Sequence, residues 1–339
     1  MNRFLHQRIH HTLQQAVEWV QKSPPLFNRS ASPLILESPL PAGIAPVIPD
    51  QQQLALLASL VNQKNNPLLG IFNETLWQFL LSQLPNCQTI AANLQVNGKK
   101  NGQPATLGEY DLIYQRKNQF IHRELAVKFY LGMPGKADNA MGSPWQHWIG
   151  PGLRDRLDRK MDRLLHHQAL LSDSHEGQEA LSALGIVQPV VKEILIQGRL
   201  FYPLYPLGTD KPAQVQSPVA QLNDIQLITQ AEQNLSAHCP PPEYCNQNHL
   251  KGYWLTQSHF LVSTRSINGD VHFQIPQKVQ WLNQNPVAEL LDHDAVIRQL
   301  QPQKRPVYIR AIHQALQQQM HLFVVPDDWP ERAVKVAKT

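Results

Sequence analysis

Residues 107–131 read LGEYDLIYQRKNQFIHRELAVKFYL and decide the fold, because they contain two strand-like runs joined by a short polar turn. In the second run, the odd positions from Ile121 to Leu131 are apolar apart from Arg123, while the even positions are mostly polar. A period of two residues is typical of a strand with one face in the core. The first run, which carries Asp111, alternates as well, so the whole stretch predicts a β-hairpin.

Charged side chains gather on one face of this predicted hairpin. Pairing of the two strands would bring Asp111 close to Glu124 and Lys128. Clustered carboxylates can hold a hard divalent cation through oxygen ligands, and a nearby lysine can orient a water or stabilise an oxyanion. The alternative is a solvated face with a weak surface ion pair. The apolar neighbours favour a central strand, where charge is costly to bury unless it is paired or bound to metal.

The segment Gly108–Ile113, followed by the strand that carries Glu124 and Lys128, resembles the PD-(D/E)XK nuclease superfamily. The likeness is greatest to the glycine-acid-x-Asp-apolar strand of its Holliday junction resolvase-like members. The whole chain also resembles a bacterial family called domain of unknown function 1853, which is grouped with those nucleases. The resemblance implies an α/β fold with an αβββαβ core, Mg²⁺ or Mn²⁺ as cofactor, hydrolysis of phosphodiester bonds, and nucleic acid, DNA above all, as partner.

On the matching positions, the resemblance makes Asp111 a metal ligand and Lys128 the motif lysine. The superfamily usually has a carboxylate two residues before that lysine, and Ala126 stands there in this chain. Glu124 lies four residues before Lys128 on the same strand face and could serve as a migrated ligand. Glu109 is another replacement. The sequence therefore leaves two functions open: a metal-dependent nuclease, or a catalytically silent module that binds nucleic acid or a protein partner.

Glu74 is a further metal-ligand candidate. Many nucleases of the superfamily carry a glutamate on the first core helix that helps to organise the metal, and the spacing of Gly70 and Glu74 resembles that arrangement. The alternative is an ordinary surface glutamate at the edge of an apolar helical stripe.

The order of helical and strand periods predicts three segments of chain. Residues 1–66 form an N-terminal extension, with a helix over 4–20, a proline-rich strap and a short helix over 51–61. Residues 67–206 form the nuclease-like core, with a helix, a strand over 88–96, the hairpin, a helix over 153–171 and a strand over 193–202. Residues 207–339 form a C-terminal α+β extension, with a helix over 224–236 and strands near 253–262, 271–275 and 306–312.

The predicted helix over 153–171 is the most cationic helix in the chain. Its polar positions include Arg154, Arg156, Lys160 and Arg163, which are candidates for contacting phosphates. Aspartates alternate with these cations, so the helix could equally present a salt-bridged solvent face.

Composition excludes several classes of protein. With 339 residues, 42% apolar and 17% charged, the chain is globular and not disordered. A formal charge of +4 fits an anionic partner without requiring one. Three scattered cysteines predict a reducing compartment, and the absence of a secretory signal or a membrane-spanning run predicts a cytoplasmic protein. No glycine-rich phosphate loop, internal repeat or Ser-His-Asp motif is recognisable.

Overall fold

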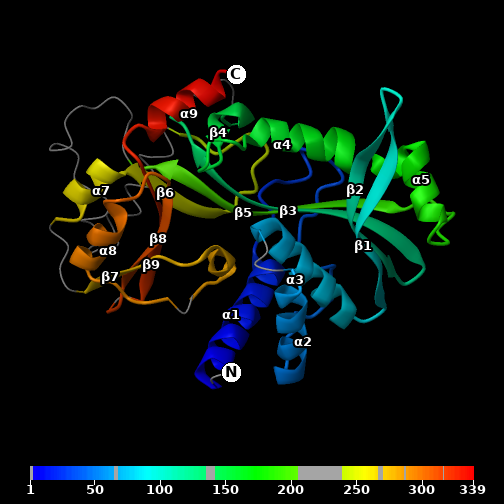
Figure 1. Cartoon of the computed structure of the whole chain (residues 1–339), viewed down its shortest axis with the longest axis horizontal. Helices are drawn as coiled ribbons and strands as arrows, with labels where there is room; N and C mark the ends of the chain where they lie inside the picture. Colours follow the sequence, from blue (N-terminus) through cyan, green and yellow to red (C-terminus); the bar gives the residue numbers. More distant parts are fainter. Residues whose placement is uncertain are drawn as a thin grey trace. The chain divides into compact units, whose positions relative to one another are not determined.

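The protein is a mixed α/β structure with a large sheet (Figure 1). The computed structural model describes residues 3–64, 68–134, 142–204, 239–265, 270–285, 288–315 and 317–339, with side chains from residue 9 onward. Its helices are α1 (Arg3–Lys22), α2 (Gln51–Asn62), α3 (Leu69–Gln83), α4 (Leu157–Arg163), α5 (His175–Ser182), α7 (Gln257–Ser263), α8 (His293–Leu300) and α9 (Trp329–Ala337). Its strands are β1 (Cys87–Lys100), β2 (Gln103–Arg116), β3 (Gln119–Gly132), β4 (Trp148–Ile149), β5 (Val191–Pro203), β6 (Leu250–Thr256), β7 (Val271–Gln274), β8 (Val307–His313) and β9 (Gln318–Val325).

The chain folds as two compact units, each assembled from segments that are distant in sequence. The first unit contains Met1–Val127, Met161–Gly198 and Lys278–Val287. The second unit contains Lys128–Lys160, Arg199–Gln277 and Ala288–Thr339. Strands β3 and β5 contribute residues to both units. Residues 67 and 206, the predicted limits of the core, and the predicted helix over 224–236 lie outside the described residues, so the three-part division stays a prediction.

In the first unit, the predicted hairpin is confirmed and a further long strand joins it. Strand β1 pairs antiparallel with β2 from Cys87↔Arg116 to Lys100↔Gln103, well beyond the predicted limits of that strand. Strand β2 pairs antiparallel with β3 from Leu112↔Arg123 to Arg116↔Gln119. The strand order in this unit is β1-β2-β3-β5.

The three N-terminal helices of the first unit form where the apolar period predicts them. Helix α2 begins with a capping box, in which Asp50 accepts from the backbone of Gln53 and the Gln53 side chain accepts from the backbone of Asp50. Helix α3 buries a continuous stripe, with Phe72, Leu76 and Leu80 all at most 1% exposed. Burial of these side chains fixes α3 in the core, because apolar area removed from water is the main stabilising contribution.

The proline-rich segment after α1 is an extended strap, as predicted, and it lies along β5. Leu26 N donates to Ile196 O at 2.8 Å, and Ile35 forms a parallel bridge with Ile194. The buried Gln197 side chain donates to the carbonyls of Val20 and Ser23 at 2.9 and 2.7 Å. These bonds satisfy backbone groups that a proline-rich segment cannot pair within itself.

In the second unit the strand order is β5-β6-β9-β8-β7, and β4 pairs with β3. Strand β6 is parallel to both β5 and β9, whereas β8 is antiparallel to β9 and β7. The predicted strand near 253–262 is wrong in its second half, because Thr256 caps α7 by accepting from His259 N. Strand β9 was not predicted, although residues 320–325 are apolar enough to be one.

The predicted continuous helix over 153–171 is also wrong. Helix α4 begins only at Leu157, because Leu153 has a left-handed φ of 61°. After α4 the chain widens into a π-helical turn over Leu164–Gln168, in which Ala169 N bonds Leu164 O at 3.0 Å. A π turn rotates the following side chains relative to an α-helix, and such turns are frequent at functional sites. Within the parts of the chain that the structure describes, no helix has both the length and the hydropathy needed to cross a membrane.

Candidate functional site

Strands β2 and β3 separate at Asp111, and this fork is the centre of the candidate site. The backbone pairing of the two strands runs from Arg116 to Leu112 and is not continued at Asp111 among the described residues. There the Asp111 carboxylate accepts from the backbone of Leu125 at 2.8 Å, and so takes the place of a backbone carbonyl in the ladder. Asp111 is 9% exposed. The structure therefore places the first predicted ligand inside the sheet.

Glu124 lies on β3 beside this fork and is completely buried. Its Oε1 lies 2.7 Å from Nε2 of His122, and its Oε2 accepts from the Gln168 amide at 3.0 Å. A buried carboxylate is costly unless donors surround it, and His122 and Gln168 supply two donors when Glu124 is ionised. No sequence pattern predicts the Gln168 contact, because the π turn that directs this side chain has no recognisable signature.

His122 is the second site residue, after Gln168, that no sequence pattern predicted. Burial lowers its pKa to about 4, against the opposing effect of nearby Asp111, so the ring is neutral at pH 7. The ring of Tyr110 meets the ring of His122 edge to face, with centroids 4.6 Å apart. The Nδ1 atom of His122 and the hydroxyl of Tyr110 are buried without a hydrogen-bond partner among the described residues. The fork thus combines two carboxylates with a neutral imidazole.

The donor set at the fork suits magnesium only in part. Mg²⁺ is commonly held by one or two carboxylates and takes its other ligands from water and substrate phosphates, and Asp111 and Glu124 match that minimum. In the described ranges, however, no group of three or more His, Cys, Asp or Glu side chains is arranged to hold a metal ion. The residues present therefore fit a metal that takes most of its ligands from water and a phosphate substrate, and do not fit one enclosed by protein ligands alone.

The other two predicted metal ligands have neighbours on β1. Glu74 on α3 is half-buried and accepts from the Asn93 amide at 2.7 Å. Asn93 itself has a left-handed φ of 51°. Glu109 is half-buried on β2 and is paired in register with Gln95. Both glutamates belong to the first unit, as Asp111 and Glu124 do.

Lys128 belongs to the second unit and has a carboxylate partner there. Its Nζ lies 2.6 Å from Oδ2 of Asp155, and the Tyr130 hydroxyl donates to Oδ1 of the same carboxylate at 3.2 Å. The Lys128 side chain is 27% exposed. The structure therefore gives the predicted motif lysine an ion pair of its own.

The four predicted phosphate-contacting cations divide between the units. Arg163 lies in the first unit, and the other three lie in the second. Arg156 is 8% exposed, makes a forked pair with Asp158 at 2.6 and 2.8 Å, and donates to Val336 O. Its guanidinium therefore has a structural role at the C-terminal helix. Arg154 and Arg163 are exposed and Lys160 is half-buried.

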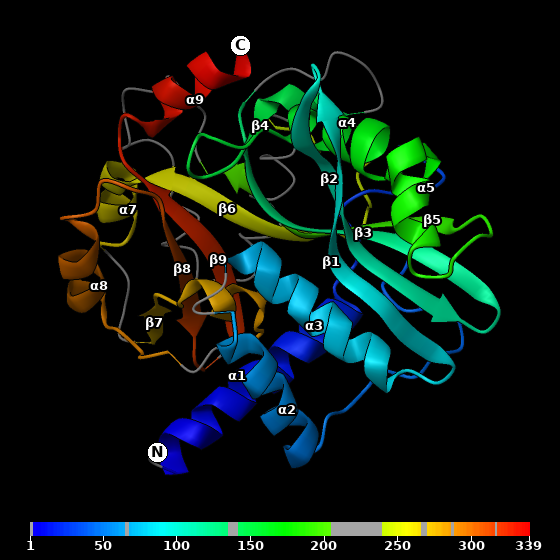
Figure 2. The ribbon, with the colours of Figure 1, turned by 45° about the vertical axis from the view of Figure 1, so that its right-hand side comes forward.

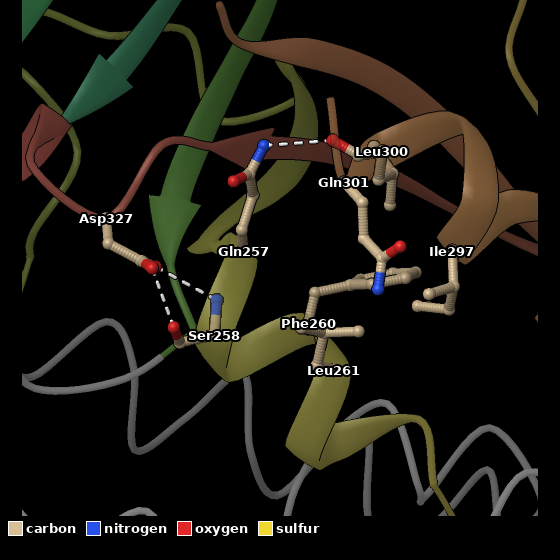
Figure 3. A pocket seen from close by; sticks show the side chains of 8 residues that line it. All are labelled: Gln257, Ser258, Phe260, Leu261, Ile297, Leu300, Gln301 and Asp327. Atoms are coloured by element: carbon tan, nitrogen blue, oxygen red, sulfur yellow. Dashed lines mark hydrogen bonds between the residues drawn. The ribbon is translucent and has the colours of Figure 1, made fainter. Parts of the chain in front are cut away.

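A separate hollow of about 210 Å³ lies in the second unit between α7 and α8 (Figure 3). Phe260 and Ile297 give it an apolar side, and Asp327 lies at its opposite end. The Asp327 carboxylate accepts from the backbone and the hydroxyl of Ser258 at 2.9 and 2.6 Å. These bonds pair a backbone N–H group in the first turn of α7, which has no acceptor within the helix. This structural role explains the position of the Asp327 carboxylate, and no bound ligand is needed to explain it.

Comparison with known proteins identifies the family. The model of a family described as Domain of unknown function (DUF1853) matches residues 15–325. Searches of curated proteins and of solved structures found no match. The matched range covers both units and includes every candidate residue of the fork, so this chain belongs to the DUF1853 family.

Proposed function

We propose that this protein is a metal-dependent phosphodiester hydrolase that acts on DNA, with Asp111 and Glu124 as ligands of Mg²⁺ or Mn²⁺. The observation that carries the proposal is the pair of buried carboxylates on two adjacent strands, at the point where the strands separate. Buried carboxylates are rare unless they are paired or bound to metal.

The order of elements supports a PD-(D/E)XK-like core. Helix α3 is followed by β1, β2 and β3, then by the two-residue strand β4, then by α4 and α5, and then by β5. This succession agrees with the αβββαβ order that the sequence resemblance implies, with the N-terminal helices and strap before it and the strands from β6 to β9 after it. The superfamily topology remains part of the proposal.

The proposed chemistry divides between metal and protein. A bound Mg²⁺ would lower the pKa of a coordinated water and neutralise charge on the phosphate. His122 and Gln168 hold the Glu124 carboxylate in one orientation, and the neutral imidazole adds no competing positive charge. The backbone bond from Leu125 holds Asp111. Glu74 and Glu109 remain secondary ligand candidates, and the catalytic role of Lys128 remains a prediction from the sequence, as does a cytoplasmic location.

Metal titration followed by a cleavage assay tests the proposal. Calorimetry with MgCl₂ and MnCl₂ should show binding that Asp111→Asn and Glu124→Gln both abolish. The purified wild-type protein should cleave at least one of single-stranded, duplex, flapped or four-way DNA when metal is added. Glu179→Gln is the control: it removes a carboxylate at an exposed position on α5 and should change neither metal binding nor DNA cleavage. The same cleavage assays with RNA show whether the activity requires deoxyribose.

A silent nucleic-acid-binding module is the second candidate, and one observation favours it. Both oxygens of Glu124 already accept from protein donors, and Ala126 stands where the superfamily usually has its carboxylate. If neither metal binds at millimolar concentration and no substrate is cut, the hydrolase proposal is wrong and the silent module is favoured. Activity that survives both Asp111→Asn and Glu124→Gln would instead point to another site or to contamination.

A further inference from the structure

The ends of β1 and β2 form a two-stranded arm, residues 97–106, that extends past α5 in the first unit (Figures 1 and 2). Its residue pairs run from Asn97↔Thr106 to Lys100↔Gln103. The turn consists of Asn101 and Gly102, with φ values of 52° and 79°. Two residues with positive φ are the requirement of the tight hairpin turn that follows the natural strand twist, so the sequence specifies a well-formed tip.

The arm has no further strand partner on either edge among the described residues, and it is anchored at its base. Strand β2 pairs with β3 only from Leu112 onward, so this part of β2 has no strand partner on that side among the described residues. A Cβ atom on Gly98 would lie 2.5 Å from Leu107, and one on Gly108 would lie 3.0 Å from Leu171. The contact of Gly108 with buried Leu171 ties the base of the arm to the core, whereas the contact of Gly98 with exposed Leu107 lies within the hairpin itself. Most residues of the arm are exposed.

The chemistry of the arm suits a polyanion. From Thr75 to Gly108 the chain contains no Asp or Glu, while Lys99 and Lys100 lie next to the tip. A Cβ on Gly98 would come within 3.2 Å of Cγ of Glu176, so the Glu176 side chain lies beside the second residue pair of the arm, away from the turn. Lysine contacts phosphate as a mobile point charge.

The uncharged polar side chains at the tip are the amides of Asn101 and Gln103, while Asn97 lies at the base and accepts from the Thr106 hydroxyl at 3.2 Å. Amide side chains carry both donors and acceptors and can pair with the edge of adenine. Because successive side chains of a strand point to opposite faces, Lys99 and Lys100 project from the two faces of the ribbon. If the ribbon entered a DNA groove with its tip first, each of the two lysines would lie near the phosphates of one DNA strand, and the amide side chains would lie near the base edges.

The edge of β1 is poorly suited to pairing with a strand of another protein. Its register shifts between Thr89 and Ala91 and again between Val96 and Asn97. Bulges and edge lysines are the features by which native sheets prevent strand addition, and Pro104 removes a donor from the other edge of the arm. These features favour nucleic acid over a protein partner.

We propose that this arm enters the major groove of double-stranded DNA. That groove is about 12 Å wide and about 8.5 Å deep and admits a two-stranded ribbon, and four residue pairs give the arm a length of about 13 Å. The major groove of duplex RNA is too narrow for side chains to read, so DNA is the partner. Duplex DNA would then be the substrate of the proposed hydrolase, on which this assignment of substrate rests. Binding through the arm itself requires neither metal nor cleavage.

Binding without metal tests the arm separately from catalysis. In EDTA, fluorescence anisotropy measures the affinity of the full chain for a labelled 20-base-pair DNA duplex over a range of NaCl concentrations. Lys99→Ala combined with Lys100→Ala should weaken binding about tenfold or more near 0.1 M salt. It should also reduce the slope of log K against log salt by about 1.8, for the loss of two phosphate contacts. Duplex RNA should compete poorly.

Two further variants show whether a loss of affinity comes from the arm itself or from removing a positive charge elsewhere on the surface. Lys117→Asn removes one charge from the exposed turn between β2 and β3, where φ is 55°, and asparagine tolerates that conformation. It should leave affinity and slope unchanged. Replacing Lys99–Pro104 by Asn-Gly shortens the arm and should reproduce the loss seen with the double substitution.

Unchanged affinity and salt slope in both arm variants would overturn the proposal, whether or not the wild-type protein cleaves DNA. So would equal affinity for a duplex whose major groove is filled by glucosylated cytosines. If the variants instead convert a wild-type dimer into a monomer without altering DNA affinity, the arm is an interface between copies and the DNA proposal is wrong.

Discussion

Arg123 on β3 and Glu193 on β5 form a buried ion pair in the first unit, with Nε and Nη2 of Arg123 at 2.9 and 2.5 Å from the same carboxylate oxygen. The Tyr114 hydroxyl donates to that oxygen at 2.8 Å. The guanidinium also lies 5.1 Å from the centre of the Trp77 ring. Arg123 was the one charged residue on the apolar face of its predicted strand, and this network explains how that face buries it.

Glu193→Gln should lower the free energy of unfolding by about 3–5 kcal/mol, because it leaves the Arg123 charge buried without its carboxylate. Burial alone would raise the pKa of Glu193, but Arg123 and Tyr114 together hold the pKa below its ordinary value. Urea unfolding at pH 7 measures the loss. The double variant Arg123→Met with Glu193→Leu should recover most of it, since apolar replacements of buried pairs are often neutral.

The exposed pair of Glu18 and Lys22 on α1 provides the control, and Glu18→Gln should cost under about 1 kcal/mol. A cost of the same size for Glu193→Gln would show that the ion pair contributes little to the core.

Stability should fall as the pH decreases from about 6.5 to about 4, in part because of His122. Burial lowers the pKa of this histidine to about 4 in the folded protein, whereas the unfolded chain has a value near 6.5. As the pH falls, the unfolded state therefore takes up a proton on His122 before the folded state does. The contribution of the neutral ring to the free energy of unfolding is complete above about pH 6.5 and is lost toward pH 4. It amounts to about 3 kcal/mol.

Unfolding free energies of wild type and His122→Gln, measured at intervals between pH 4 and pH 7.5, check this expectation. The variant should have a shallower pH dependence, by at most about 1.4 kcal/mol per pH unit. His175→Gln, at an exposed position on α5, is the control. Parallel curves for wild type and His122→Gln would show that the ring is not the group responsible.

A carboxylate at position 126 should be able to replace the one at position 124. Residues two apart on a strand face are separated by about 7 Å, so Ala126 lies between Glu124 and Lys128 along β3. Glu124→Ala should abolish the metal binding proposed for the fork, and adding Ala126→Glu should restore it in part. Calorimetric titration with MnCl₂ measures both variants.

Ala126 is 6% exposed, so the introduced glutamate is buried, and a far-UV spectrum must first show that the double variant folds. If Glu124→Ala alone leaves the metal affinity unchanged, the idea of a migrated ligand is wrong even if the protein is a nuclease.

Local patterns in the sequence account for the elements that local forces form. The two-residue period around Asp111 and Glu124 predicted the β2–β3 hairpin, and the helical period predicted α1, α2 and α3. Patterning of this kind is reliable because a strand or helix must bury one face, whatever its neighbours are. The prediction from patterning failed at two places. After α4, one extra residue per turn makes a π turn in place of the continued α-helix, and at α7 the Thr256 cap starts a helix where the pattern had predicted a strand.

By itself the sequence determined that Asp111 and Glu124 lie on adjacent strands, since a short hairpin leaves few alternatives for their register. Only the tertiary structure decided what surrounds them. Gln168 reaches Glu124 from 44 residues away, and Arg123 finds Glu193 from 70 residues away. Lys128 faces Asp155. Partners so distant in sequence are selected by packing of the whole chain, because the cost of burying a charge is offset only where the fold supplies its counter-charge.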